Sequence, residues 1–497
     1  MLGIEDHEIE PGDAVQLHDG RRIELDEAAE DRAAGVQLTF RFGIEHRRIP
    51  LLIRFAESLF TNVIQHGSAA AISQAFICVG FGRRRRHRRP TTGDDVKRST
   101  DRILTTHVGS LIRPLNVLEG MMAKVLGEPV DEAQFQRDVT QGVADVVAKQ
   151  AEIGIDIPSD GEISKPSFHN YVVARLGGLE KVPPSERGAY YAALTEEFPG
   201  FMQQYNAMYK TMWMPPELDA EKVRQAANTP PARVRVAAPI TYVGQAALQT
   251  DLDNYKAALA GKDFVEAFMP SATPARDDAD AGTVYTSESA YLYALADAMH
   301  VEYRAIVDAG LVVQLDLGLP ARNQVLPGNP NPTPEDLRRA SERQVEAYNH
   351  ALRGIPEDRV RYHMCWGSMN TPHTTDVPLR EVIDIIFKIN AQAYVIEGAN
   401  PRHEHEWMVW RDVKLPDGKI LIPGVISHQT NVVEHPELVA WRIQNYASVV
   451  GRENVIAGTD CGFSQGWNMA RVHPEVQWAK LGALVEGAAL ASRQLWR

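Results

Sequence analysis

The sequence predicts an α/β protein in which residues 100–497 form a (β/α)8 TIM barrel with insertions, preceded by an extension at residues 1–99. Two observations predict this fold class. From residue 102 onward, eight short apolar runs are mostly separated by segments whose apolar residues recur every three or four positions. Titratable side chains also follow six of those runs, as expected where strand ends share one rim. A doubly wound open sheet has the same alternation and stays the alternative.

The runs that we interpret as strands occupy residues 102–106, 155–158, 234–240, 312–316, 360–365, 393–396, 420–426 and 455–458. Helical periodicity marks residues 288–309, 334–353, 379–390, 436–449 and 474–495. A further amphipathic helix is indicated by Phe135, Val139, Val143, Val146 and Val147. Helix-start signals such as Thr333-Pro334-Glu335-Asp336 support these assignments. Residues near 163–232 and 262–286 are the expected insertions.

The composition is that of a globular protein that acts in water. Of the 497 residues, 44% are hydrophobic and 24% charged, and the formal net charge is -13, which argues against a nucleic-acid binder. No apolar run reaches the ~18 residues of a membrane span. Three cysteines make no disulfide framework, so we expect a reducing cytoplasm. The sequence carries no signal for the oligomeric state.

Residues 1–99 differ in character from the rest of the chain. They lack sustained helical periodicity and contain an arginine run at 83–89, broken only by His87. We interpret this run as a solvated segment rather than a nucleic-acid or membrane patch. We expect an extension that is disordered or not native, the latter if translation starts at the codon for Val96.

Four residues at three strand ends have the chemistry of zinc ligands. His363 and Cys365 end the fifth run, Glu397 follows the sixth, and Cys461 follows the eighth. Thiolate, imidazole and carboxylate are the usual zinc donors. CxxC spacing, which is typical of closed structural sites, is absent here. A mixed set with an exchangeable carboxylate therefore favours catalysis, in which zinc activates a substrate thiol.

Other strand ends supply candidate substrate contacts. The loop after the first strand contains Gly109 and Ser110, which suit an anion. Glu162 and Asp316 place carboxylates where an ammonium group fits, and His428 after the seventh strand is a candidate general acid. The alternative interpretations are that Gly109 and Ser110 form an ordinary turn and that Glu162 and Asp316 are structural carboxylates. The cluster His403-Glu404-His405-Glu406 is interpreted as a solvated loop, because histidines two apart do not share a helix face.

Residues 100–497 resemble the catalytic C-terminal barrel of the cobalamin-independent methionine synthases, in their short, single-barrel branch. The resemblance rests on His363-Met-Cys365, Glu397, Cys461 in Asp-Cys-Gly, and the loop Thr105-Thr106-His107-Val108-Gly109-Ser110. It implies a zinc enzyme that moves a methyl group from 5-methyltetrahydrofolate polyglutamate to homocysteine. It also implies that Gly109 and Ser110 hold the homocysteine carboxylate, that Glu162 and Asp316 bind its amine, and that His428 delivers a proton.

Departures from the family pattern keep other functions open. The segment Gln314-Leu-Asp316-Leu-Gly lacks the acidic residue that follows the Asp in the family, and no tryptophan can be assigned to the pterin. Pro239-Ile-Thr241 is similar to a Pro-x-Thr segment that follows the third strand in that family. The alternatives are the same zinc chemistry on another thiol, such as coenzyme M, or with a non-folate donor. Zinc-dependent hydrolysis and a purely structural zinc are two further alternatives.

Overall fold

The computed structural model describes residues 97–182, 192–230, 233–275, 279–280, 284–316, 318–319 and 332–497, with positions 326 and 329 and the strands β1 (Val15–Gln16) and β2 (Arg22–Ile23). The chain divides into two units, Met1–Gly93 and Asp94–Arg497. In the first unit, β1 and β2 pair antiparallel. The predicted extension otherwise lies almost wholly outside the described residues, so its character stays a prediction.

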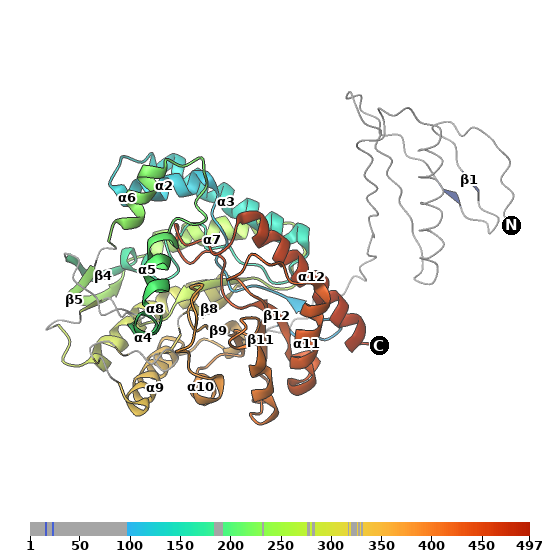
Figure 1. The fold of residues 1–497 in the computed structure, drawn as a ribbon. Helices are drawn as coiled ribbons and strands as arrows, with labels where there is room; N and C mark the ends of the chain where they lie inside the picture. The colour runs from blue at the N-terminus through green and yellow to red at the C-terminus, as the bar shows by residue number, and fades with distance from the viewer. Residues whose placement is uncertain are drawn as a thin grey trace. The chain divides into compact units, whose positions relative to one another are not determined.

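The second unit is built on a parallel sheet, which confirms the predicted fold class (Figure 1). Seven strands are hydrogen-bonded in the order β3-β12-β11-β10-β9-β8-β6. They are β3 (Leu104–Thr105), β6 (Phe268–Ala272), β8 (Val312–Asp316), β9 (Val360–Met364), β10 (Ala393–Ile396), β11 (Ile420–Ile426) and β12 (Ile456–Thr459).

Residues 156–158 join the two edges of this sheet and close the barrel. Ile157 forms a parallel bridge with Thr106, just after β3. On the other side, the Phe268 N–H of β6 donates to the Pro158 carbonyl at 3.1 Å, and the Val265 N–H donates to Asp156 O at 2.9 Å. The predicted second strand at 155–158 therefore has the predicted place.

Alternation along each strand decides what lies inside the barrel. Ten apolar residues form one interior cluster: Leu104, Val108, Ile157, Phe268, Val312, Ala393, Val395, Ile420, Ile422 and Ile456. Because side chains on a strand repeat every two residues, the positions after Val312 that share its face are Gln314 and Asp316. The same period after Ala393 and Val395 reaches Glu397. Apolar residues thus fill the interior, and polar ones stand at the strand ends.

Helices cover the outside of the barrel (Figure 1). Their bounds are α2 (Leu115–Leu126), α3 (Glu132–Ile153), α7 (Gln245–Leu259), α8 (Glu288–Asp308), α9 (Pro334–Ala351), α10 (Leu379–Ile386), α11 (Pro436–Val450) and α12 (Pro474–Leu495). Short 3-10 helices lie at η3 (Asn170–Ala174), η5 (Glu357–Arg359), η6 (Glu404–Arg411) and η7 (Arg452–Asn454). None of the helices in the described ranges is both long and apolar enough to cross a membrane.

The helix starts follow the predicted signals. Thr333 caps α9, forming a capping box with Asp336, and Pro334 is the first helical residue. Histidine side chains cap α11 and α12 in the same way, each directly before a proline.

The prediction of the third barrel strand at residues 234–240 is wrong. That run lies in β5 (Arg233–Tyr242), which pairs with β4 (Leu176–Val182) and β7 (Ala279–Asp280) in a separate three-stranded sheet. Several side chains of β5 are exposed between buried ones, as on a sheet with one open face. The real third strand, β6, is buried at every position but contains Pro270 and Ser271, so it lacks a continuous apolar run.

The insertion between residue 163 and the start of α7 is held to the barrel helices α7 and α8 by a buried ionic cluster. Arg175 pairs with Asp251 and, at 3.1 Å, with Glu302. Glu302 also accepts hydrogen bonds from Tyr171 at 2.5 Å and Tyr242 at 2.7 Å. Burial alone would raise the pKa of Glu302, but Arg175 and these hydrogen bonds lower it to about 2. The carboxylate is therefore ionised and fully partnered.

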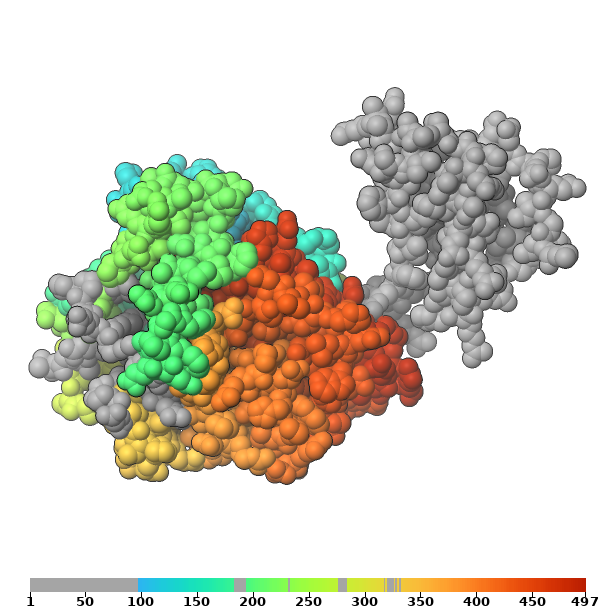
Figure 2. Space-filling view, in the orientation of Figure 1, coloured from blue at the N-terminus to red at the C-terminus, as the bar shows by residue number. Residues whose placement is uncertain are grey.

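Three helices of the insertion, α4 (Ala192–Glu197), α5 (Pro199–Met208) and α6 (Ala220–Asn228), lie outside the sheet. Figure 2 shows α4 and α5, in green, against the orange segments that follow the later strands. The Tyr205 hydroxyl accepts the Asn370 N–H at 2.8 Å, and Thr374 donates to Glu197 at 2.6 Å. The insertion thus contacts the loop after β9.

Deleting residues 1–95 is expected to leave the barrel folded, because Ser99 and the residues after it supply their own contacts. The Ser99 hydroxyl donates to Val455 O at 2.5 Å. We expect the shortened protein to melt within about 2 °C of the full chain in calorimetry. An insoluble or unfolded product would show that the extension belongs to the fold.

Candidate metal centre

Two of the candidate ligands come from β9 by simple alternation. Arg361 and His363 share the inward face of this strand, and Cys365 is the next residue on that face. Arg361 lies deeper in the barrel, with its guanidinium over the Phe268 ring at 3.9 Å and hydrogen-bonded to the His107 carbonyl at 3.0 Å. His363 and Cys365 therefore stand at the carboxyl end of the barrel, above a filled interior.

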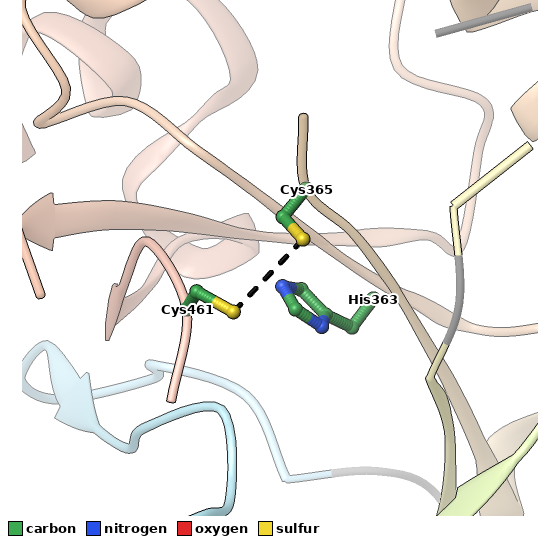
Figure 3. A group of neighbouring side chains, drawn as sticks. All are labelled: His363, Cys365 and Cys461. Carbon is green, nitrogen blue, oxygen red and sulfur yellow. Dashed lines mark hydrogen bonds between the residues drawn. The ribbon is translucent and has the colours of Figure 1, made fainter. Parts of the chain in front are cut away.

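Cys461 completes a group of three donors with His363 and Cys365. Their candidate ligand atoms all lie within 4.8 Å of one another. Figure 3 shows one ring nitrogen of His363 facing the two sulfurs, which are 3.9 Å apart. Two sulfurs that each bind a tetrahedral zinc at about 2.3 Å lie about 3.8 Å apart, so this separation fits a shared zinc ion.

The close approach of the two cysteine sulfurs also suits a bound cation. The Cys461 thiol donates to Cys365 Sγ, and this bond, with burial, raises the pKa of Cys461 well above its ordinary value. Cys461 therefore keeps its proton in the hydrogen bond to Cys365. A divalent cation bound between them would take the place of that proton and stabilise both thiolates.

Asp316 orients His363. The His363 Nδ1 is 2.8 Å from Asp316 Oδ1, so Nε2, which is 3.3 Å from the Asp460 carbonyl oxygen, is the nitrogen that could bind a metal. Burial lowers the pKa of His363, but the Asp316 hydrogen bond and the nearby Cys365 raise it above its ordinary value. Gln314 in turn donates to both oxygens of Asp316, at 2.9 and 3.1 Å. A carboxylate behind a histidine ligand is the usual outer partner of zinc sites.

Glu397, the fourth predicted ligand, lies outside the group of three. Its Oε1 accepts the Trp366 N–H at 2.8 Å, and its Oε2 accepts from Asn400 at 3.2 Å. Burial, together with Asp460 and Cys365, raises the pKa of Glu397 to about 8. Glu397 is thus close to the thiols but held by amide donors, and its role as a ligand stays a prediction.

Asp460 fixes the loop that carries Glu397. Its Oδ1 accepts the N–H groups of Gly398 and Ala399, both at 2.8 Å. A Cβ at Gly424 would overlap this carboxylate, so the approach requires glycine there. The sequence pattern singled out Cys461 but missed its neighbour, because the function of Asp460 depends on contacts with another strand end.

The first-strand loop lies against the same centre. Gly109 has a φ of +143°, and a Cβ there would overlap Pro270 and lie 3.5 Å from Glu162 Oε1. Ser110 contacts the segment after Cys461, since its carbonyl accepts the Phe463 N–H at 2.8 Å. The predicted anion loop and the predicted amine carboxylate are therefore neighbours.

Glu162 is a strained and buried acid. It has a φ of 54°, in the left-handed region that non-glycine residues rarely adopt. Within the described residues, its buried Oε2 has no hydrogen-bond partner. Burial, with the charges of Asp316 and Asp160, raises the pKa of Glu162 to about 7, although the charges of Lys165 and Arg113 act in the opposite direction. A cationic ligand group would stabilise this carboxylate.

His428 lies at the end of β11, as predicted, but it is fully buried. Its Nε2 is 3.3 Å from Ser368 O, and its Nδ1 has no partner in the part of the chain that the structure describes. Burial and the charge of Arg471 lower the pKa of His428 well below its ordinary value. In this conformation it is a neutral histidine, and its role as a proton donor stays a prediction.

The interpretation of residues 403–406 as a solvated loop is wrong for His403 and Glu406, which are buried, and holds for His405, which is exposed. His403 is buried, with its ring nitrogens 2.8 Å from Glu406 and 3.0 Å from Asp376. Burial lowers the pKa of His403, but these two carboxylates raise it to about 9. Its ring stacks on Trp366, with centroids 4.0 Å apart. Packing on that tryptophan, which the spacing could not reveal, buries the histidine behind Glu397.

Comparisons with known proteins agree with the fold, although no family model matches the sequence. Two Bacillus subtilis (strain 168) proteins, YxjH and YxjG, both described as uncharacterized, are 24% and 21% identical to this chain. The alignments cover 79% and 80% of this chain and 94% and 97% of theirs. A 5-methyltetrahydropteroyltriglutamate--homocysteine methyltransferase of Thermotoga petrophila is 21% identical over 310 residues, 60% of this chain and 33% of that protein.

Two solved structures share the fold. A B12-independent methionine synthase from Shewanella sp. W3-18-1, in complex with selenomethionine, aligns with a TM-score of 0.57 and 17% identity, over 79% of this chain and 99% of that one. A putative vitamin-B12 independent methionine synthase from Listeria monocytogenes aligns with a TM-score of 0.53 and 19% identity, over 78% and 98%. At these identities the likeness shows the fold alone.

Replacing either clustered thiol is expected to abolish tight metal binding. Cys365→Ser and Cys461→Ser each remove a soft donor, so we expect zinc affinity to fall by more than about 100-fold, beyond the usual outer-sphere range. Competition with a chelating dye measures this. Cys78→Ser is the matched control, because Cys78 lacks the spacing of a ligand. Equal zinc affinity in Cys461→Ser and Cys78→Ser would remove Cys461 from the site.

Proposed function

We propose that this protein is a zinc-dependent methyltransferase that moves the methyl group of 5-methyltetrahydrofolate polyglutamate to the thiol of homocysteine, giving methionine. The observation that carries the proposal is the group His363, Cys365 and Cys461 at the carboxyl end of the barrel, with acids and an anion loop around it. The solved B12-independent methionine synthases of the same fold support it.

The donor set favours activation of a thiol. A zinc ion held by His363, Cys365 and Cys461 supplies a lowered thiol pKa, so that the substrate sulfur attacks as a thiolate at neutral pH. Two thiolate donors make such a metal a weak Lewis acid for water, which disfavours hydrolysis as the alternative. A purely structural zinc is disfavoured because the group stands at the functional rim rather than in a closed CxxC site.

Residues around the group suit the two ends of an amino acid. Glu162 has a buried oxygen that accepts no hydrogen bond from the described residues, and Asp316 lies close enough to raise its pKa. An ammonium group between the two carboxylates would compensate both charges. Gly109, which packs against Pro270 beside Glu162, belongs to the loop that we assign to the substrate carboxylate. This pairing favours homocysteine over a sulfonate thiol such as coenzyme M, which has no ammonium group.

Glu397 and His428 take the remaining roles. Glu397 would be the fourth zinc ligand in the resting protein and would be displaced by the substrate thiol. The hydrogen bonds from Trp366 and Asn400 would then stabilise the displaced carboxylate. His428 delivers a proton to the leaving nitrogen of the pterin. Because burial keeps this histidine neutral in the resting protein, the ring must first take up a proton from water as imidazolium, and delivering that proton returns it to the neutral form.

Methionine formation tests the proposal. The zinc-loaded protein is mixed with L-homocysteine and 5-methyltetrahydropteroyltriglutamate, and methionine is measured by mass spectrometry. We expect turnover in the full chain and a loss of at least about 1,000-fold in Cys461→Ser, because thiol activation is lost. Turnover with coenzyme M and an alkyl donor, but none with homocysteine, would favour the alternative thiol instead.

Binding of the product is expected to depend on pH through Glu162. Since burial raises the pKa of Glu162 to about 7, the carboxylate is ionised above that pH and can hold the methionine ammonium group there. We expect the Kd for L-methionine to fall about tenfold between pH 6 and pH 8, measured by calorimetry. L-Methionine has no thiol that titrates in this range.

Two variants complete this experiment. Glu162→Gln should bind weakly at every pH, while Glu152→Gln, at an exposed position on α3, should retain the wild-type profile. A wild-type Kd that does not change with pH would contradict the assignment of Glu162 to the ammonium group.

A further inference from the structure

A side-chain amide lies against one of the two clustered sulfurs. Gln465 Nε2 is 3.7 Å from Cys461 Sγ and also donates to the Gly462 carbonyl. The amide is buried, with 4% of the residue exposed. An NH2 group has two hydrogens, so it can serve the carbonyl and the sulfur at once.

The orientation of this amide is fixed by an arginine. Arg471 Nε donates to Gln465 Oε1 at 2.6 Å. Because a guanidinium can only donate, the amide oxygen must face Arg471, and the NH2 group must face Cys461. The flipped amide would set N–H against N–H on one side and a carbonyl oxygen against the sulfur on the other.

Arg471 is itself held from two other parts of the chain. Its Nη2 donates to the Ser368 hydroxyl at 3.0 Å, in the loop after β9. It also hydrogen-bonds to Tyr205 of α5 in the insertion, whose hydroxyl accepts the Asn370 N–H. A continuous chain of hydrogen bonds therefore runs from the insertion through Arg471 and Gln465 to Cys461.

We propose that Gln465, oriented by Arg471, is a positioning residue whose N–H···S hydrogen bond sets the donor strength of the Cys461 thiolate at the metal centre. The inference rests on the metal centre of the proposed function. A thiolate that accepts a hydrogen bond donates less charge to a bound metal. The substrate thiol then meets a more electropositive site, and its pKa falls further.

The Gly462 bond offers a simpler role for Gln465, which is to hold the turn after Cys461. Gln465→Glu loses the NH2 group that faces both the Gly462 carbonyl and the sulfur, so stability and the metal spectrum of this variant, measured together, separate the two roles. It has the same shape and keeps an oxygen on Arg471, now as an ion pair, but it presents an oxygen rather than N–H to the sulfur. If Gln465 only holds the turn, a variant with wild-type stability should also have the wild-type metal spectrum. If Gln465 donates to the sulfur, the spectrum should change even when stability does not.

Cobalt(II) substitution in the full chain provides the measurement. The thiolate-to-cobalt charge-transfer band reports the donor strength of the sulfurs, and chelator competition reports affinity. We expect Gln465→Glu and Gln465→Ala to shift this band and to weaken metal binding about 10- to 100-fold, the range of outer-sphere changes. Gln136→Glu, on the exposed side of α3, should match the wild type.

Arg471→Lys extends the test to the orienting residue, since the rigid two-sided contact of the guanidinium is lost. We expect its band to move in the same direction as that of Gln465→Ala. If the wild type shows a thiolate-to-cobalt band, and Gln465→Glu has the same band and the same metal affinity, the inference is overturned and the proposed function stands. A wild-type protein without any thiolate band would overturn both.

Discussion

Closure of a parallel barrel is the constraint on which the rest of this structure depends. Once residues 156–158 join β3 to β6, each strand has one face inside, and all strand ends meet at one rim. The two-residue repeat then determines which side chains enter. On β9 and the residue after it, this repeat places Arg361, His363 and Cys365 on the inward face. Arg361 fills the interior of the barrel, and His363 and Cys365 above it are candidate metal ligands. Cys461 joins them from β12.

Burial of acidic groups is the second shared feature of the rim. Burial, with charged neighbours, raises the pKa values of Glu162 to about 7 and Glu397 to about 8, and burial raises that of Asp460 to about 6. Backbone N–H groups at the ends of β9 and β10 hold two of these acids, whereas one oxygen of Glu162 has no donor among the residues that the structure describes. A metal cation beside the thiols and an ammonium group beside Glu162 would offset the charges that the fold buries.

The sequence predicts the parts of this arrangement that follow from local pattern. An apolar run that ends in His363-Met-Cys365 or in Glu397 predicts both the position of the strand and the side chain that faces the barrel interior at its end. Where the pattern depends on packing, prediction fails: β5 resembles a barrel strand but lies in a surface sheet, and β6 has Pro270 in its middle. His403 is buried by stacking on Trp366 and by its contacts with Glu406 and Asp376. The contacts of Asp460 and Gln465 join segments that spacing cannot relate.

Zinc X-ray absorption on the purified protein, with and without L-homocysteine, reports whether this centre activates a thiol. We predict two sulfurs among the zinc ligands of the resting protein, from Cys365 and Cys461, and a third sulfur when homocysteine is added. L-Homoserine, which has oxygen in place of that sulfur, should leave the count at two. A zinc shell that does not change with homocysteine would contradict thiol activation at this centre.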